Sequence, residues 1–576
     1  MKDGFVRCAS ATVDIKVADT DYNTLNIIEA IKDAAQNDIK LIVFPELCIT
    51  GYTCGDLFLQ KILIDSAKDS LIKIAKATEN LDITAVVGLP YVAEQTLYNC
   101  AAVVNGGHIK GLVPKLNIPN YAEFYEVRHF TAGKNEVTYV NINGEEIPFG
   151  ANILFKTDAC EDFVLAVEIC EDLWTAMPPS VNHALAGATI IANLSASNEV
   201  IAKDEYREML VKSQSAKLYC GYIYSDAGYG ESTTDLVFAG DNMIAENGTI
   251  LARSKRFHNE CVYTELDLER LVGERKKSNT YNIVGSEKYV SVKLDMNIGD
   301  TKITRYVDKQ PFVPSDDKKR EKRSEEILSI QSLGLKKRLD HTNAKTAVVG
   351  VSGGLDSTLA LLVTVRAFDS LNIDRKNIIA VTMPCFGTTN RTYNNAVNFA
   401  NSLGVTLKEV NITAAVNQHF ADIEHDPNVY DVTYENSQAR ERTQILMDVA
   451  NKSGGLVIGT GDMSELALGW ATYNGDHMSM YGVNAGVPKT LIRYLVDYEA
   501  KRTNNDILKK TLQDILDTPV SPELLPPKDG KISQKTEHIV GPYELHDFFL
   551  YHLMRFGSNP SKILRLAEVA FDGIYD

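Results

Sequence analysis

Ser352-Gly353-Gly354-Leu355-Asp356-Ser357 is the stretch that decides the fold of the second half of this chain. One apolar run, residues 346–351, precedes it, and another, residues 358–365, follows it. This order predicts a buried strand, a glycine-rich turn and the start of a helix. Such a turn offers backbone N–H groups to a phosphate, and glycine lets the backbone approach the anion closely. The lysine of a G-x-x-x-x-G-K-[ST] loop is absent, so the stretch is not that motif.

The residues around this stretch alternate between strand-like and helix-like patterns. Strands are predicted at 346–351, 378–383 and 456–460. Helices are predicted at 324–338, 358–369, 394–402, 436–452 and 490–501. The alternation indicates a doubly wound parallel sheet, in which ligands bind at the carboxyl ends of the strands.

The first half of the chain is also α/β, but with an antiparallel component. Strand-like runs occur at 41–44, 85–89, 101–104, 164–169, 189–194 and 222–224, and helical patterns at 22–36 and 62–78. Asn105-Gly106-Gly107 and Glu246-Asn247-Gly248 are typical of hairpin turns. A dense run of charge at 315–326, after two prolines, predicts a linker between the halves.

Composition narrows the class of protein. The 576 residues are 44% hydrophobic and 23% charged, which is ordinary for a globular protein with more than one core. The net charge of −17 argues against a nucleic-acid partner. The nine cysteines are irregularly spaced, and neither a signal peptide nor an apolar run long enough for a membrane span is present. We therefore expect no membrane association and a reducing, cytoplasmic location.

Three reactive side chains of the first half each end a strand-like run. They are Glu46, Lys115 and Cys170. Taken singly, each has a structural explanation, as a surface acid, a loop charge and a small buried side chain. Taken together, they offer a base, a cation and a nucleophile. A cysteine nucleophile needs such neighbours, because the thiolate is the reactive form and the free thiol is mostly protonated near neutral pH.

These segments resemble the nitrilase superfamily, whose amidases use a Glu–Lys–Cys triad. The resemblance covers roughly residues 1–285 and is carried, in the family's order, by Phe44-Pro45-Glu46-Leu47, Gly88-Leu89-Pro90, Tyr98-Asn99-Cys100-Ala101-Ala102, Pro114-Lys115-Leu116 and Glu168-Ile169-Cys170-Glu171-Asp172-Leu173-Trp174. It implies an α-β-β-α sandwich in which Glu46 is the base, Cys170 the nucleophile and Lys115 the group that stabilises the oxyanion. Attack on an amide would give a thioester and free ammonia, and hydrolysis would then give the acid.

Other segments resemble the subgroup that hydrolyses glutamine, at 115–130, 193–197 and 229–235. The resemblance implies a glutamine pocket lined by Tyr121, Trp174 and Ser197. Lys203 stands near a position where some relatives carry a pocket arginine. For Glu123 and Glu126 two interpretations stay open, a role in positioning the triad and a place on the solvent-facing surface.

The SGGxDS stretch resembles the pyrophosphate loop of the ATP pyrophosphatase family, whose members adenylate a carbonyl oxygen and release pyrophosphate. Further segments resemble NAD synthetases: the N-x-Q-A-R-x-R helix at 436–442, the G-T-x-x-x-S-E segment at 456–470, Tyr473-Asn474-Gly475-Asp476, Pro488-Lys489-Thr490, and the loop at 519–524. Because these elements occur in one order, the full-length resemblance is to the glutamine-dependent NAD synthetases. It implies a synthetase domain at 324–576 behind a linker at 286–323.

The resemblance also implies where the substrates bind. ATP is expected at Ser352, Gly353, Gly354, Asp356, Ser357 and Thr460. The substrate nicotinic acid adenine dinucleotide is expected at Arg440, Arg442, Asp476 and Lys489, the lysine as a compact cation for phosphate. Mg²⁺ would bridge the phosphates on hard oxygen ligands, with Asp356 and Glu465 as the expected ligands. A homo-oligomer formed through synthetase-domain helices is implied as well.

Simpler explanations exist for some of these residues. Glu465 is also the kind of acid favoured in a helix's first turn, and Arg440 and Arg442 are also compatible with solvated helix charges. Two other functions remain open from the sequence: the same chemistry on a different carboxylate or carbonyl acceptor, and a nucleotide-binding scaffold without activity. The intact triad and phosphate loop argue against the scaffold. The apolar and basic tail after Phe548 matches no motif.

Overall fold

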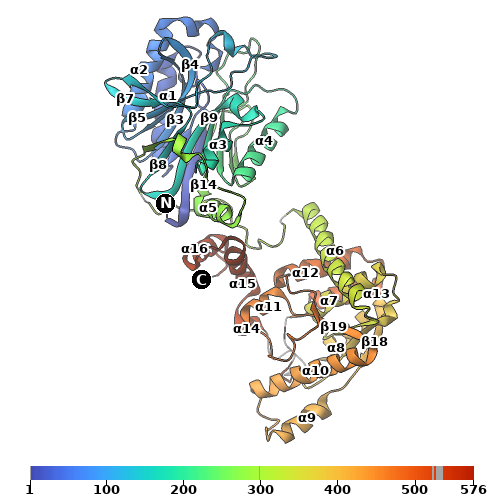
Figure 1. Ribbon diagram of the computed structural model, residues 1–576. Coiled ribbons are helices and arrows are strands. Elements are labelled where there is room, and N and C mark those ends of the chain that lie inside the picture. Colours follow the sequence, from blue (N-terminus) through green and yellow to red (C-terminus); the bar gives the residue numbers. More distant parts are fainter. Residues whose placement is uncertain are drawn as a thin grey trace. The chain divides into compact units, whose positions relative to one another are not determined.

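The computed structural model describes residues 2–297, 299–314, 316–519, 521, 524–526 and 536–575 (Figure 1). The chain divides into two compact units, Met1–Tyr306 and Val307–Asp576. Part of the segment predicted as a linker is folded, because residues 290–293 form a strand of the first unit. Of the loop expected at 519–524, residues 520, 522 and 523 lie outside the described residues.

Two mixed sheets lie face to face in the first unit. The larger has the order β14-β1-β2-β3-β4-β5-β7-β6 and is formed by β1 (Phe5–Ala11), β2 (Leu41–Val43), β3 (Thr84–Ala93), β4 (Thr96–Asn105), β5 (His108–Pro114), β6 (Thr138–Ile142), β7 (Glu145–Phe149) and β14 (Cys261–Asp267). The smaller has the order β13-β12-β11-β10-β9-β8-β15 and is formed by β8 (Ile153–Thr157), β9 (Cys160–Ile169), β10 (Ile190–Ser195), β11 (Gly221–Asp226), β12 (Met243–Glu246), β13 (Thr249–Arg253) and β15 (Val290–Lys293). Both predicted hairpin turns are confirmed, since β4 pairs antiparallel with β5 and β12 with β13.

Helices cover the outer faces of both sheets. They are α1 (Thr20–Gln36), α2 (Lys61–Ala77), α3 (Pro179–Leu185) and α4 (Lys203–Leu218). Helix α5 (Leu268–Lys277) instead packs Leu268 and Leu271 into the core between the sheets. Successive strand residues point to opposite faces, so Leu41 and Val43 pack between the sheets while Ile42 packs under α1 and α2. The result is the predicted α-β-β-α sandwich, with a hydrophobic layer between each pair of structural layers.

The second unit is built on a five-stranded parallel sheet of order β18-β17-β16-β19-β20. Its strands are β16 (Thr346–Gly350), β17 (Ile378–Thr382), β18 (Thr406–Glu409), β19 (Gly455–Gly459) and β20 (Tyr481–Gly482). Its helices are α6 (Asp317–Thr342), α7 (Leu355–Ser370), α8 (Asn390–Leu403), α9 (Thr413–Asp422), α10 (Val432–Ser453), α11 (Met463–Leu468), α12 (Lys489–Arg502), α13 (Asp506–Leu516), α14 (Glu537–Val540), α15 (Tyr543–Leu550) and α16 (Pro560–Ala570). The doubly wound parallel sheet predicted from the sequence is confirmed.

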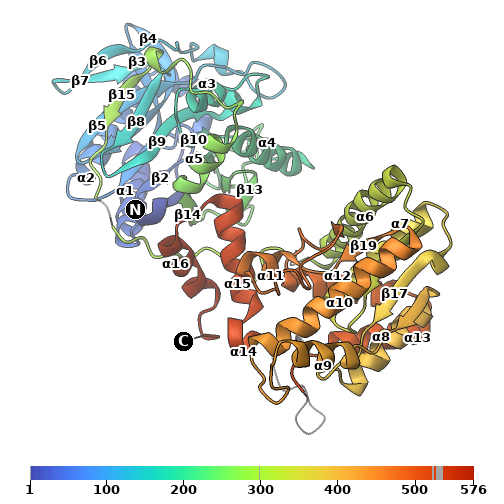
Figure 2. The same cartoon turned by 60° about the horizontal axis from the view of Figure 1, so that its bottom comes forward.

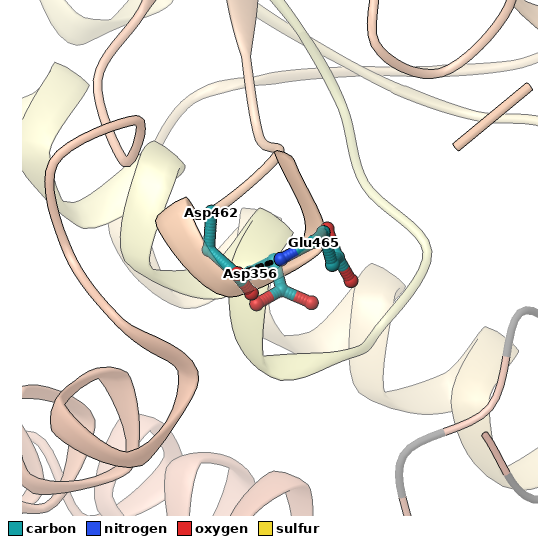
Figure 3. A group of neighbouring side chains, drawn as sticks. All are labelled: Asp356, Asp462 and Glu465. Carbon is teal, nitrogen blue, oxygen red and sulfur yellow. Dashed lines mark hydrogen bonds between the residues drawn. The ribbon is translucent and has the colours of Figure 1, made fainter. Parts of the chain in front are cut away.

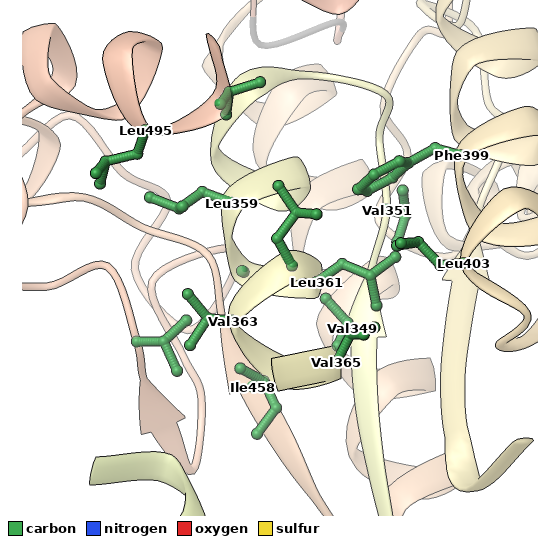
Figure 4. Close-up of a cluster of buried hydrophobic side chains, with 14 of the residues drawn as sticks. Val349, Val351, Leu359, Leu361, Val363, Val365, Phe399, Leu403, Ile458 and Leu495 are labelled. Carbon is green, nitrogen blue, oxygen red and sulfur yellow. The ribbon is translucent and has the colours of Figure 1, made fainter. Parts of the chain in front are cut away.

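Both faces of this sheet are buried, which explains why its strands read as continuous apolar runs. Val349 packs with Leu361 of α7 and Phe399 of α8 on one face (Figure 4). Val348 and Val457 pack on the other face, which α9 and α10 cover (Figure 2). Residues 317–323, predicted as the end of the linker, instead form the first turns of α6, where Asp316 caps the helix by accepting from the Lys319 N–H.

Candidate active site

The three reactive residues of the first unit come from strands of both sheets. Glu46 follows β2, Lys115 follows β5 directly, and Cys170 follows β9 directly at the start of a 3-10 turn, Cys170–Trp174. The backbone is left-handed at Cys170 (φ 44°) and at Leu47 (φ 54°), next to Glu46. A non-glycine residue holds such a conformation only where its surroundings enforce it, and such residues concentrate at functional sites.

Lys115 lies at the centre of this group. Its Nζ donates to Glu46 Oε1 at 2.7 Å and to both carboxylate oxygens of Glu126, at 2.8 and 2.9 Å. The side chains of Lys115 and Glu46 are fully buried. Although burial acts to lower it, the Glu126 and Glu46 carboxylates raise the pKa of Lys115 well above its usual value. The amine is therefore a permanent cation in a buried site.

The two carboxylate oxygens of Glu46 have different surroundings. Oε1 accepts from Lys115 and from Asn99 Nδ2, at 2.6 Å. Oε2 is buried and has no hydrogen-bond partner in the part of the chain that the structure describes. Burial raises the pKa of Glu46 to about 7, against the opposing charge of Lys115. A carboxyl group with this pKa and one unused oxygen is suited to accept a proton near neutral pH.

Cys170 is 6% exposed, and the charges of its neighbours shift the pKa of its thiol. Burial, and after it the charge of Glu46, raises the pKa of the Cys170 thiol well above its usual range, while Lys115 opposes the rise. The resting side chain is therefore a thiol. It can act as a nucleophile only if a neighbouring base removes its proton during the attack.

The two glutamates left open by the sequence have different partners in the structure. Glu126 chelates the Lys115 amine and accepts from the Tyr52 hydroxyl at 2.8 Å. Glu123 instead accepts from Asn198 at 2.5 Å. Tyr52 was missed by the sequence analysis, because it lies far along the chain from Glu126 and belongs to no quoted motif.

A cavity of about 370 Å³ opens beside Cys170 and is lined by all three residues predicted to bind glutamine. The Ser197 hydroxyl oxygen is buried with no partner among the described residues, although its backbone N–H donates to Asp226 at 2.8 Å. Tyr121 donates to Glu171 at 2.9 Å, and Trp174 stacks on Tyr206 with centroids 5.5 Å apart. An unused buried hydroxyl facing an amide-sized cavity is what a polar substrate requires.

Lys203 supplies the positive charge of this cavity. Its Nζ lies 5.2 Å from the Trp174 ring centroid and 5.5 Å from that of Phe124, and it donates to Asn198 at 2.6 Å. Burial lowers the pKa of Lys203. A cation in an aromatic surrounding, beside the cavity, can pair with the carboxylate of an amino acid.

In the second unit the SGGxDS stretch forms the turn from β16 to α7, as predicted. Gly353 has φ +88°, and a Cβ built on it would lie 2.2 Å from the carbonyl oxygen of Thr392. Only glycine fits there. Hydroxyl groups brace the turn: Gly354 N–H donates to Ser352 Oγ at 3.2 Å, and Ser357 Oγ donates to the Gly354 carbonyl at 3.1 Å.

This turn lies at the topological switch point of the sheet. In the order β18-β17-β16-β19-β20 the chain moves outward in one direction from β16 and returns to start β19 on its other side. Ligands of doubly wound sheets bind at the carboxyl ends of these two strands. Asn484 joins them, since its Nδ2 donates to the carbonyl oxygens of Asp356 at 2.9 Å and Thr460 at 3.1 Å.

Three carboxylates meet at this point (Figure 3). Asp356 comes from the first turn of α7, while Asp462 and Glu465 come from the start of α11, and one oxygen of each lies within 4.8 Å of the others. Lys489 Nζ lies among them, 2.8 Å from Asp356 and Glu465 and 2.6 Å from Asp462. Lys489, predicted to meet a substrate phosphate, is therefore ion-paired within the cluster.

The donor set of this cluster fits a divalent cation. Three hard oxygen donors face one ammonium, which leaves an excess of negative charge. Burial raises the pKa of Asp462 to about 6, and burial together with the Asp356 charge raises that of Glu465 to about 8, as expected where carboxylates outnumber cations. The sequence analysis missed Asp462, although an acid three residues after β19, a strand of the switch point, was a usable signal.

The remaining predicted residues form a second group on α10 and the loop after α11. Arg440 is exposed and donates from Nε to the Tyr473 carbonyl at 3.1 Å. Asp476 accepts from the Thr472 N–H at 2.6 Å. Burial raises the pKa of Asp476, and the nearby charge of Arg442 opposes the rise. Both arginines therefore lie next to the loop that carries Asp476.

Two families match separate stretches of this chain. Residues 7–276 match the carbon-nitrogen hydrolase family, and residues 327–570 match the NAD synthase family. The fold and the two groups of residues thus define an enzyme in which a carbon–nitrogen hydrolase is joined to an NAD synthase.

Curated relatives match nearly the whole length. The glutamine-dependent NAD(+) synthetase of Mycobacterium tuberculosis is 41% identical over 99% of this chain and 86% of the relative, and that of Mycobacterium leprae is 39% identical over 97% and 85%. A crystal structure of a glutamine-dependent NAD(+) synthetase from Cytophaga hutchinsonii is 24% identical, covers 97% of this chain and 88% of the other, and has a TM-score of 0.42. The chain belongs to the family of glutamine-dependent NAD(+) synthetases.

None of the helices that the structure describes is both long and apolar enough to cross a membrane.

Proposed function

We propose that the first unit hydrolyses glutamine and that the second uses the ammonia to amidate nicotinic acid adenine dinucleotide at the expense of ATP. The products are NAD, AMP, pyrophosphate and glutamate. The names of the relatives favour this acceptor over another carboxylate, and the complete triad argues against a scaffold.

The observation that carries the proposal is the unused oxygen of Glu46 in a site where Lys115 is held as a cation. As Cys170 Sγ attacks the amide carbon of glutamine, Glu46 Oε2 takes the thiol proton. The oxygen of the amide becomes an oxyanion, which the Lys115 amine stabilises. Glu46 then returns the proton to the leaving nitrogen, and ammonia departs from a thioester on Cys170.

Hydrolysis of the thioester repeats the same proton transfers. Glu46 takes a proton from the attacking water, Lys115 stabilises the second oxyanion, and the sulfur leaves with the proton from Glu46. Ser197 and Lys203 face the cavity that would hold the amino-acid part of the substrate. The unused hydroxyl of Ser197 and the cation of Lys203 match the polar and charged groups of glutamine.

In the second unit, the turn at Gly353 and Gly354 is suited to the phosphates of ATP, because its backbone can approach an anion closely. Arg440 and Arg442 are suited to the phosphates of the dinucleotide. The nicotinate carboxylate attacks the α-phosphorus and displaces pyrophosphate. Ammonia then attacks the adenylated carboxyl carbon, AMP leaves, and the attacking nitrogen loses a proton to the solvent to give the amide.

Asp356, Asp462 and Glu465 would hold Mg²⁺, which would supply positive charge next to the phosphates. Lys489 adds a second positive charge at the same point, and the carboxylates keep its amine in place. A cytoplasmic location belongs to the proposal, supported by nine cysteines that are all free. A homo-oligomer through the second unit belongs to it as well, on the family resemblance.

The experiment is to measure NAD formation from nicotinic acid adenine dinucleotide, ATP and Mg²⁺, with glutamine in one reaction and ammonium in the other. We expect NAD from both nitrogen sources, with one AMP released per NAD. Glutamine hydrolysis without NAD from either source would disprove the acceptor and leave the hydrolase assignment standing.

A further inference from the structure

Helix α15 (Tyr543–Leu550) leads into the tail after Phe548, for which the sequence suggested no role. The structure joins this helix to α11 and α12, whose first turns carry Glu465 and Lys489 of the ion-paired cluster. The link is Asp547, which is 1% exposed and carries its carboxylate into the junction between the three helices.

Both oxygens of Asp547 are used. Oδ1 accepts a short hydrogen bond from the Ser464 hydroxyl. Oδ2 accepts from the Thr490 N–H at 2.8 Å and from the Thr490 hydroxyl at 2.6 Å. Each partner is a chain neighbour of a cluster residue, since Ser464 precedes Glu465 and Thr490 follows Lys489.

These contacts also complete the N-terminus of α12. The cap position of this helix is Pro488, which makes no side-chain cap hydrogen bond. The first N–H groups of the helix are instead satisfied from outside it, Lys489 N–H by Ser464 Oγ at 2.9 Å and Thr490 N–H by Asp547. A carboxylate placed at a helix N-terminus is further stabilised by the helix dipole.

The same helix supports the Lys489 side chain. The Tyr543 ring, one turn earlier in α15, lies under the amine with its centroid 5.3 Å from Nζ. Asp547 thus fixes the backbone position of Lys489 through Ser464 and Thr490, while Tyr543 contacts the amine at the end of the Lys489 side chain. Burying a carboxylate is costly unless its hydrogen bonds are met, so a contact that served packing alone would favour an apolar side chain here.

We propose that Asp547 is a positioning residue for the ATP and metal site, holding Glu465 and Lys489 in register through Ser464 and Thr490. Lys489 and a divalent cation share the same three carboxylates. The position of the Lys489 amine therefore determines how well the carboxylate oxygens can orient toward the cation. Loss of the Asp547 contacts lets α11 and α12 shift against each other and weakens cation binding. The inference rests on the proposed function of the second unit.

The test is to titrate Mn²⁺ into the full-length protein with ATP present, following the loss of the free-ion signal by electron paramagnetic resonance. Asp547→Asn keeps the size of the side chain but replaces one acceptor oxygen by an amide donor. We expect its Kd for Mn²⁺ to rise at least about threefold, and the Mg²⁺ concentration for half-maximal ammonium-driven synthesis to rise with it. A smaller change in Kd overturns the inference.

Glu544→Gln is the matched control. Glu544 lies on the same helix and accepts from Tyr575 at the surface, away from α11 and α12. This variant should bind Mn²⁺ as the parent protein does. A rise as large as that of Asp547→Asn would assign the effect to general loosening of α15 and overturn the inference.

Thr490→Val keeps the test decisive if Asp547→Asn does not fold. It removes the hydroxyl contact with Asp547 and keeps the shape and the N–H, so a smaller rise in Kd is expected. Where both variants fold, the double variant should show less than the sum of the single effects, because the residues act through one contact. An additive result, or an unchanged Kd in Thr490→Val, counts against the inference. A parent protein that binds Mn²⁺ with ATP but makes no NAD from ammonium would reject the proposed function instead.

Discussion

Glu46 shows how a buried carboxylate is divided between two tasks. One oxygen is held by Asn99 and Lys115, which orient the group and favour its charged form, while the other is left for a proton. Burial works in the opposite direction and raises the pKa of Glu46 to about 7. The pair of opposing effects leaves a base that is partly deprotonated at neutral pH. Because Lys115 and Glu126 share the site, the apparent pKa that a pH profile of glutamine hydrolysis would give belongs to these groups together with Glu46.

Replacing Asn99 by leucine tests this balance. The hydrogen bond from Asn99 favours the charged carboxylate, so its loss raises the pKa of Glu46 further. Since the base must be deprotonated, glutaminase activity rises with pH through this pKa. We expect the acid limb of kcat/KM for glutamine to move upward by roughly half to one pH unit. Ammonium-driven synthesis is the control and should keep its pH profile. An acid limb that stays in place would contradict the role given to Glu46.

At the scale of elements, the turn between β16 and α7 depends on one backbone conformation. Gly353 combines positive φ with an approach to the Thr392 carbonyl that excludes any side chain. Hydroxyl groups brace the residues on either side. The turn therefore connects a buried strand to the N-terminus of a helix, and backbone N–H groups in such a position are suited to bind a phosphate.

Gly353→Ala should impair ATP binding. A strained left-handed alanine costs about 1–3 kcal/mol, and the clash adds to it, so we expect synthesis to fall at least about tenfold with either nitrogen source. Glutamine hydrolysis reports on the first unit and should persist. Gly486→Ala serves as the control, because its added Cβ meets open space at ordinary φ. ATP binding by calorimetry checks the effect, and unchanged binding in Gly353→Ala would count against the loop.

Sequence patterns predicted these elements because buried parallel strands and glycine turns leave local signatures. The triad followed from a resemblance carried by several short segments. The helix predicted from 324 begins earlier, at 317, and residues 317–323 were assigned to the linker because an exposed helix start and a linker share the same charged composition. Contacts such as Ser464 with Asp547, 83 residues apart, were out of reach, because no periodicity encodes which distant side chains a fold brings together.

At the scale of the whole molecule, the two half-reactions depend on different chemistry and can be separated. The first uses a thiol, a carboxylate and an amine, whereas the second has a cluster of hard oxygen donors. Removal of divalent cations by a chelator should therefore abolish NAD formation from both nitrogen sources and leave glutamine hydrolysis intact. Excess Mg²⁺ should restore synthesis. Parallel loss of glutamine hydrolysis would show that the first unit needs a metal too.

Cys170→Ala separates the two half-reactions by removing glutamine hydrolysis and leaving the synthetase site unchanged. The sulfur is needed only to release ammonia, so glutamine-driven NAD formation should fall to background, by at least about a thousandfold for loss of a covalent nucleophile. Ammonium supplied in solution bypasses this step, and its use should stay within about twofold of the parent protein, because a thiol-to-methyl change in a small buried side chain disturbs packing little. The measurement is NAD formed per minute from each nitrogen source under the same ATP and Mg²⁺. Equal loss with both sources would mean that the two sites do not work as a donor and an acceptor of ammonia.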